Sequence, residues 1–172
     1  MIKKFLFITL LAITPSIVEG QSYLSVNDLL SIRKCLINKT QQVGQNILKK
    51  RGYDKQLVYG ADQEDFYFYQ NCRLVEIGGA YSSDGEYLKS DKITDNASYV
   101  HLSYAAIGVF VHSKSKVQVW MNQLKALGYR QDTRRGGKDN YGEDYYFIKK
   151  GSPELRIVYK NYAYKLEVQR GD

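Results

Sequence analysis

Length, composition and charge limit what this chain can be. It has 172 residues, two cysteines, sixteen tyrosines and a formal net charge of +7. This size suits about one domain, and two cysteines are too few for a disulfide-rich scaffold. The positive charge favours an acidic partner or an anionic surface.

The first residues have the pattern of a secretory signal peptide. Lys3 and Lys4 precede a nonpolar run that ends near Ile13, and Val18-Glu19-Gly20 suits a cleavage site. The run is too short to cross a bilayer as a stable helix, although a buried N-terminal helix or strand is an alternative. We expect removal of 1–20 near Gly20 and a secreted or periplasmic product of residues 21–172 that does not span a membrane.

A helix is predicted over 26–51. Ser25 and Asp28 form a capping box before it, and Gly52 suits its end. Its apolar stripe is Leu29, Ile32, Leu36, Val43 and Ile47.

Runs rich in Tyr, Phe and Val follow this helix. Those at 53–59, 65–70 and 72–77 predict antiparallel strands. Residues 78–96 are polar and predict a long loop. Residues 97–111 predict one long strand, with a bulge near Gly108.

The second half of the chain repeats this order. A helix is predicted over 112–127, and strands over 129–134, 144–150, 155–160 and 162–169. The helix ending is written twice, 76 positions apart: Leu48, Lys49, Gly52 and Tyr53 recur as Leu124, Lys125, Gly128 and Tyr129.

These elements predict an α+β fold in one domain. Two tandem α-β-β-β-β units, about 25–111 and 112–170, would form an antiparallel sheet of up to eight strands with the helices packed on one face. This layout resembles that of the β-lactamase inhibitor proteins, which are secreted and bind an enzyme with the open face of the sheet. The resemblance covers the mature chain as an order of elements, and it implies an open sheet face used for protein contact. That family relies on two disulfides, whereas this chain has cysteines for one.

Cys35 and Cys72 would form a disulfide in an oxidising compartment. On a continuous helix, however, Cys35 points away from the apolar stripe. Either the helix breaks near 38–40, or Cys35 is not paired with a strand of the core. A zinc site with His101 and His112 lacks ligand-like spacing, so we expect no metal.

The positive charge lies in the second half, where residues 112–172 hold thirteen basic and seven acidic side chains, a net charge of +6. Strand alternation places Leu155 and Ile157 toward the helices and the polar residues between them toward water. We therefore expect a basic open face that binds an acidic partner, with tyrosines as contact residues. The predicted binding residues are Arg134, Arg135, Tyr141, Tyr145, Arg156, Lys160 and Lys165.

No catalytic residue set is recognised in the sequence, so we expect neither an enzyme nor a cofactor. Ser113 and Lys116 match Ser-x-x-Lys, but the other elements of penicillin-binding enzymes do not occur in the chain. Nucleic acid is not an expected partner, because no recognition motif occurs. The sequence favours a protein-binding module, such as an inhibitor or immunity protein that covers a toxin or enzyme. The alternative is a protein that binds envelope polysaccharide or another anionic polymer.

Overall fold

The computed structural model describes residues 23–38, 41–56, 66–76, 88–102, 106–138, 142–160 and 162–169. The predicted signal peptide lies outside these residues. Three helices are described: α1 (Val26–Ile37), α2 (Gln41–Lys50) and α3 (Lys114–Ala126). The strands are β1 (Asp54–Gln56), β2 (Phe66–Gln70), β3 (Leu74–Glu76), β4 (Leu88–Ser90), β5 (Ser98–Leu102), β6 (Ala106–Val111), β7 (Arg130–Lys138), β8 (Glu143–Ile148), β9 (Leu155–Lys160) and β10 (Ala163–Gln169).

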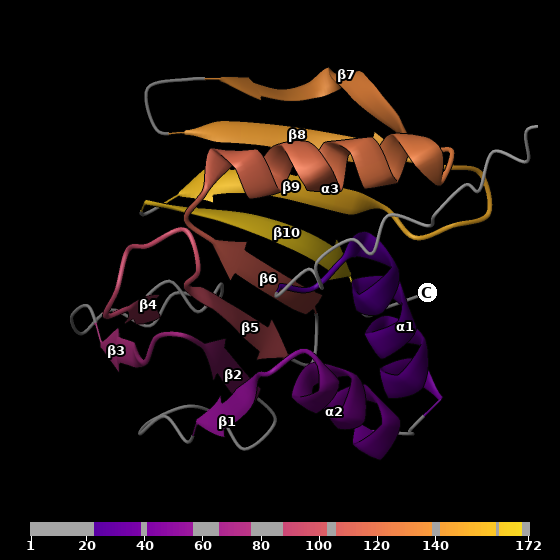
Figure 1. Cartoon of the computed structure of the whole chain (residues 1–172). Helices are drawn as coiled ribbons and strands as arrows, with labels where there is room; N and C mark the ends of the chain where they lie inside the picture. The colour runs from indigo at the N-terminus through magenta and orange to yellow at the C-terminus, as the bar shows by residue number, and fades with distance from the viewer. Residues whose placement is uncertain are drawn as a thin grey trace, which may run out of the picture.

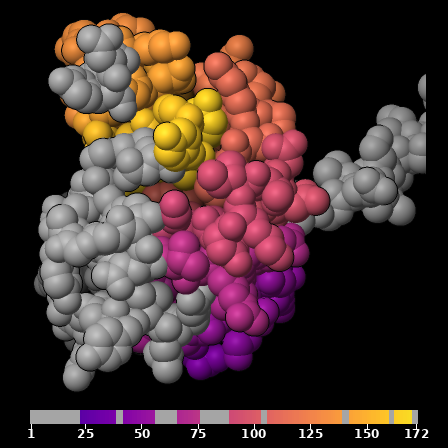
Figure 2. Space-filling model, turned by 90° about the vertical axis from the view of Figure 1, so that its left-hand side faces the viewer, coloured from indigo at the N-terminus to yellow at the C-terminus, as the bar shows by residue number. Residues whose placement is uncertain are grey.

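Eight of the described strands form one antiparallel sheet, in the order β1-β2-β5-β6-β10-β9-β8-β7 (Figure 1). Each half of the chain supplies four neighbouring strands. The last strands of the two halves, β6 and β10, pair at the centre with Leu166 opposite Val109. The predicted α+β fold of two tandem units is confirmed, and the structure adds that the second unit runs across the sheet in the reverse order of the first. Seen from the side in Figure 2, the colours pass from the orange of β7 and β8 to the indigo of the first helices.

The repeated helix ending forms the same backbone motif twice. Gly52 donates to Lys49 O at 2.9 Å and Tyr53 to Leu48 O at 3.0 Å; Gly128 donates to Lys125 O at 3.0 Å and Tyr129 to Leu124 O at 2.9 Å. These two bonds define a Schellman motif, in which glycine takes the left-handed conformation. The φ angles agree, at 78° for Gly52 and 82° for Gly128. The matching letters in the sequence therefore encode one geometry, which directs the chain from each helix into the first strand of its unit.

The helices pack on one face of the sheet around a single large core. Leu29 and Ile32 of α1 meet Trp120 and Leu124 of α3 over the central strands, and all four side chains are fully buried. Burial of each such side chain stabilises the fold by about 1.5–3 kcal/mol.

The predicted capping box at the start of α1 is present, with Ser25 N–H donating to Asp28 at 3.0 Å and Asp28 N–H to Ser25 Oγ at 3.1 Å.

Two strand predictions and one loop prediction in the first half are corrected. Residues 97–111 form the β5–β6 hairpin rather than one strand, with Leu102 opposite Ile107. The residues that enter the helix-side core change from even numbers in β5 (Val100, Leu102) to odd numbers in β6 (Ile107, Val109), and a hairpin produces this change as well as a bulge does. The run 72–77 contributes β3, which pairs with β4 from the predicted loop 78–96 and stands apart from the large sheet.

The predicted helix over 26–51 is two helices, α1 and α2, and the predicted disulfide is not formed. Val43 was predicted on the apolar stripe of one continuous helix. It is half exposed, because α2 is a separate helix and does not continue the apolar stripe of α1. Both cysteines are thiols. Cys35 lies where α1 meets α2, near Gly44, whereas Cys72 is buried beyond β2 and donates to Ser98 O at 3.4 Å. The two cysteine side chains therefore have different neighbours.

Candidate functional site

The sheet face away from the helices has an aromatic half and a charged half. Alternate residues on the strands reach this face, because their neighbours fill the helix-side core. One row of directly opposite residues crosses the sheet: Tyr67, His101, Gly108, Glu167, Arg156 and Tyr146. The next row is Tyr69, Tyr99, Phe110, Lys165, Val158 and Asp144.

The aromatic half belongs to the first unit and packs against β3. Tyr67 stacks on His101 with ring centroids 4.6 Å apart, and Tyr99 stacks on Phe110 at 4.2 Å. Leu74 of β3 joins Tyr67 and Tyr99 in a second buried cluster. The β3–β4 hairpin thus lies against this half of the face, and the charged half on β7 to β10 becomes the better candidate for a binding site.

The charged half ends in a wide bulge on the edge strand β7. Gln131 pairs with Phe147, but the next β7 residue in register is Gly136, which faces Tyr145. Residues 132–135 therefore all lie opposite one residue, Tyr146. An added Cβ on Gly136 would come within 2.2 Å of Asp144 O, and the φ of Gly136 is 76°. Only glycine lets β7 rejoin β8 this closely after the bulge.

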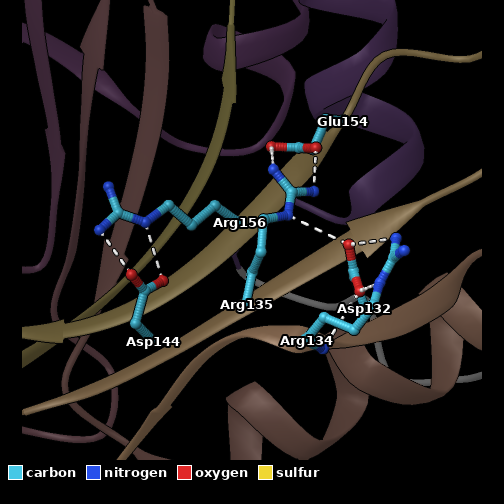
Figure 3. A network of polar contacts seen from close by, with 6 residues as sticks. All are labelled: Asp132, Arg134, Arg135, Asp144, Glu154 and Arg156. Carbon is cyan, nitrogen blue, oxygen red and sulfur yellow. Dashed lines mark hydrogen bonds and ion pairs between the residues drawn. The ribbon is translucent and has the colours of Figure 1, made fainter.

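Asp132 organises the two arginines of the bulge (Figure 3). The carboxylate is buried and accepts from Arg134 Nε at 3.0 Å, from Arg134 Nη2 at 3.3 Å and from Arg135 Nε at 3.1 Å. It also accepts from the Arg134 backbone N–H at 3.2 Å. The side-chain bonds from Arg134, followed by its backbone bond and the bond from Arg135, lower the pKa of Asp132 to about 2. The Arg134 side chain is nevertheless 82% exposed. Its guanidinium is therefore held by Asp132 and is also accessible to solvent.

Arg135 and Arg156 each place a guanidinium group over the ring of Tyr146. Their central carbons lie 4.5 Å and 5.3 Å from the centroid of the Tyr146 ring. Arg135 reaches on to Glu154, which precedes β9. Arg156 makes two bonds to Asp144, at 2.8 Å and 2.7 Å, and these raise the pKa of Arg156. These contacts link β7, β8 and β9, and Figure 3 shows the charged residues among them.

The open face is less basic than the sequence predicted, because acids on the same face pair with its cations. Arg156 of β9 pairs with Asp144 of β8, and Lys165 pairs with Glu167 two residues along β10. The strand pattern could place Glu167 beside Lys165, but it could not show the pair of Arg156 with Asp144, which is on another strand. The more exposed cations lie along β7, where Lys138 is 74% exposed and sits 3.5 Å from Glu143. The strand predicted over 129–134 is longer in the structure, so Arg134, Arg135 and Lys138 all lie in β7.

The predicted tyrosine contacts differ from those of the structure. Tyr145 packs against the helix-side core and its hydroxyl donates to Glu143 at 3.4 Å, so it does not share a face with Arg156. Tyr141 lies outside the described residues, as does the side chain of Lys160. Tyr146 is the tyrosine that sequence reasoning missed. The alternation of buried Phe147 with its neighbours could have identified it.

The described residues of this site supply charged and aromatic side chains. Among the described residues, no group of three or more His, Cys, Asp or Glu side chains could hold a metal ion. No described helix is long and apolar enough to cross a membrane. Fixed guanidinium groups bind carboxylates and other oxyanions through paired hydrogen bonds.

Comparisons with known proteins give no match to a protein-family model, a curated protein or a solved structure. The resemblance to the β-lactamase inhibitor proteins therefore rests on the order of elements alone. The role in binding that it implies remains a prediction.

Proposed function

We propose that this chain is a secreted or periplasmic, non-catalytic protein-binding module that captures an acidic partner through the β7 edge. The partner would be a toxin or an enzyme, and binding would cover its functional surface. Arg134 and Arg135 would make the central contacts. This proposal keeps Arg134 and Arg135 of the binding residues that the sequence predicted, and it places the interface at the strand where the cations are more exposed.

The observation that carries the proposal is the arrangement of Arg134. A guanidinium has five N–H donors, and Asp132 accepts from Nε and one Nη2 hydrogen. Donors remain on the outward side for a partner carboxylate. Because Asp132 already restricts the side chain, little rotamer entropy would be lost on binding, which favours affinity. Arginine is also among the residues that most often dominate the energy of protein interfaces.

The β7 edge has a second property that suits a selective contact. A long unpaired edge strand can add strands from other chains without discrimination. Here the bulge over 132–135 interrupts the edge, and the strand carries four cations and one acid. Pairing by backbone alone is thereby discouraged, while a partner with matching carboxylates would gain charged hydrogen bonds.

The test is capture of a partner from the envelope fraction of the source organism and from the secreted proteins of its competitors. The bait would be the wild-type chain, a double variant Arg134→Glu with Lys138→Glu, and a control. The control reverses Lys49 and Lys50 of α2, at the opposite end of the sheet from β7 (Figure 1). Both double variants change the net charge by the same amount.

We expect one stoichiometric protein to be retained by the wild type and by the α2 control, and lost from the β7 variant. Equal loss of the partner from both variants would mean that binding depends only on the net charge of the chain, and it would contradict the proposed site. Retention of polysaccharide instead of protein would favour the alternative function, binding of an anionic envelope polymer. A matched circular dichroism spectrum and melting temperature would show that the variants are folded.

A further inference from the structure

A cavity of about 290 Å³ lies on the helix side of the fold. One wall is the outer face of α1, and the other comes from the end of α3 and the turn between β8 and β9, which lie at the right of Figure 1. The residues that line it are Leu30, Arg33, Lys34, Ile37, Leu127, Tyr129, Lys149, Ser152 and Pro153. The cavity is thus built by three segments that are distant in the sequence.

The lining divides into an apolar part and a cationic part. Leu30, Ile37 and Leu127 supply aliphatic surface, and Ile37 is 45% exposed. Arg33, Lys34 and Lys149 supply three positive charges, and no acid is among the described lining residues. The described lining therefore places cationic side chains beside aliphatic surface.

Two of the cations are held in place by backbone carbonyls. Arg33 Nε donates to Gln169 O at 2.6 Å, and Lys149 Nζ donates to Leu127 O at 2.8 Å. The bond from Lys149 uses one of the three N–H donors of its ammonium group. Tyr129 adds a neutral hydroxyl: burial raises its pKa, although a hydrogen bond with Ser152 and the charge of Arg33 act in the opposite direction. The polar groups therefore converge from α1, the α3 end and the β8–β9 turn.

We propose that this cavity binds a small amphiphile with one short apolar chain and one anionic head group. The chain would lie on Leu30, Ile37 and Leu127, and the head group would meet Lys149, Lys34 and Arg33. At about 30 Å³ for each water-sized group, the volume holds roughly ten such groups, which is the size of a medium-chain carboxylate. Clefts lined by apolar side chains with a few convergent polar groups are the usual form of ligand sites. The proposal is independent of the β7 edge.

The test is titration of the folded protein with sodium octanoate, followed by calorimetry and by NMR shifts of Tyr129 and Ile37. Octanol and acetate test the chain and the head group separately. Vesicles of phosphatidylglycerol test whether the same chemistry is taken from a lipid surface. We expect saturable binding of octanoate, with octanol and acetate each at least about tenfold weaker.

Three variants assign any binding to this cavity. Lys149→Gln should weaken octanoate at least about tenfold through loss of a charged hydrogen bond. Its matched control is Lys150→Gln, whose side chain is exposed and does not line the cavity. Ile37→Asn should weaken octanoate while leaving the weak binding of acetate unchanged. Lys34→Gln repeats the test at an exposed cation, in case Lys149→Gln unfolds the end of α3.

Four outcomes separate the ligand sources and decide the proposal. Binding of free octanoate, weakened in Lys149→Gln, supports a free amphiphile. Association with vesicles alone, without binding of free octanoate, overturns the proposal, because phosphatidylglycerol carries two long acyl chains and the cavity is proposed for one short chain. No binding of either probe overturns the proposal. Binding that is equal in the wild type, Lys149→Gln and Ile37→Asn also overturns it, because the ligand would then sit elsewhere.

Discussion

Replacement of Gly136 by alanine should destabilise the protein more than the same replacement of its neighbour Gly137. Both glycines have positive φ angles, 76° and 134°, so both variants carry backbone strain of about 1–3 kcal/mol. The surroundings differ. A Cβ on Gly136 would meet Asp144 O at 2.2 Å, whereas a Cβ on Gly137 would have no atom within 4 Å. Gly137→Ala is therefore the matched control for strain.

The extra effect of Gly136→Ala follows from that overlap. Relieving it requires β7 to move from β8, which strains the pairs from Gly136 to Lys138 and the bulge before them. Overpacking of this kind costs about 1–3 kcal/mol more. At roughly 2–4 °C per kcal/mol for a chain of this length, the melting temperature should be about 2–12 °C lower than that of Gly137→Ala.

The assay is thermal unfolding of both variants by circular dichroism, together with the carboxyl NMR shift of Asp132. We expect the larger loss of stability in Gly136→Ala to be accompanied by a changed Asp132 signal, since the bulge is displaced. Equal melting temperatures for the two variants would refute the close approach of β7 to Asp144. That result would also contradict the arrangement of Arg134 and Arg135 that the bulge produces.

Three further predictions concern the core, the pH dependence and the cysteines. Leu48→Ala and Leu124→Ala remove equivalent, fully buried side chains, and each should lower the free energy of unfolding by about 2–5 kcal/mol in denaturant titrations; a negligible loss at either position would contradict the shared helix ending. The carboxyl signal of Asp132 should titrate near pH 2 rather than near 3.8, so its contribution to stability is present above about pH 4 and is lost as the pH falls through 2; titration at its ordinary pKa would mean that the arginines do not hold it. Thiol counting after unfolding without reductant should find two thiols, and a count of zero would show that the disulfide forms after all.

The parts of the fold that depend on local sequence were predictable. The capping box at Ser25 and the two Schellman motifs need only residues within a few positions, and both appear as expected. The α+β class followed from the order of these elements. The break between α1 and α2 was recognised as one of two alternatives, because Cys35 did not fit a continuous stripe.

The parts that depend on pairing between distant residues were not predictable. The β5–β6 hairpin and the predicted bulge near Gly108 produce the same change of alternation, and only strand partners distinguish them. The salt bridge of Arg156 with Asp144 requires the register of β8 and β9. The bulge left one local sign, a pair of glycines four residues after Asp132. Its consequence for Arg134 depends on the whole edge of the sheet.

The most direct test of the β7 binding site is the affinity of the captured partner for the wild type, for Arg134→Gln and for the α2 control. Arg134→Gln removes the charge without adding an acid next to Asp132, and a circular dichroism spectrum that matches the wild type would show that the variant is folded. The account predicts at least about tenfold weaker binding by Arg134→Gln, with the α2 control close to the wild type. An unchanged affinity for Arg134→Gln would contradict the claim that the β7 edge holds the partner.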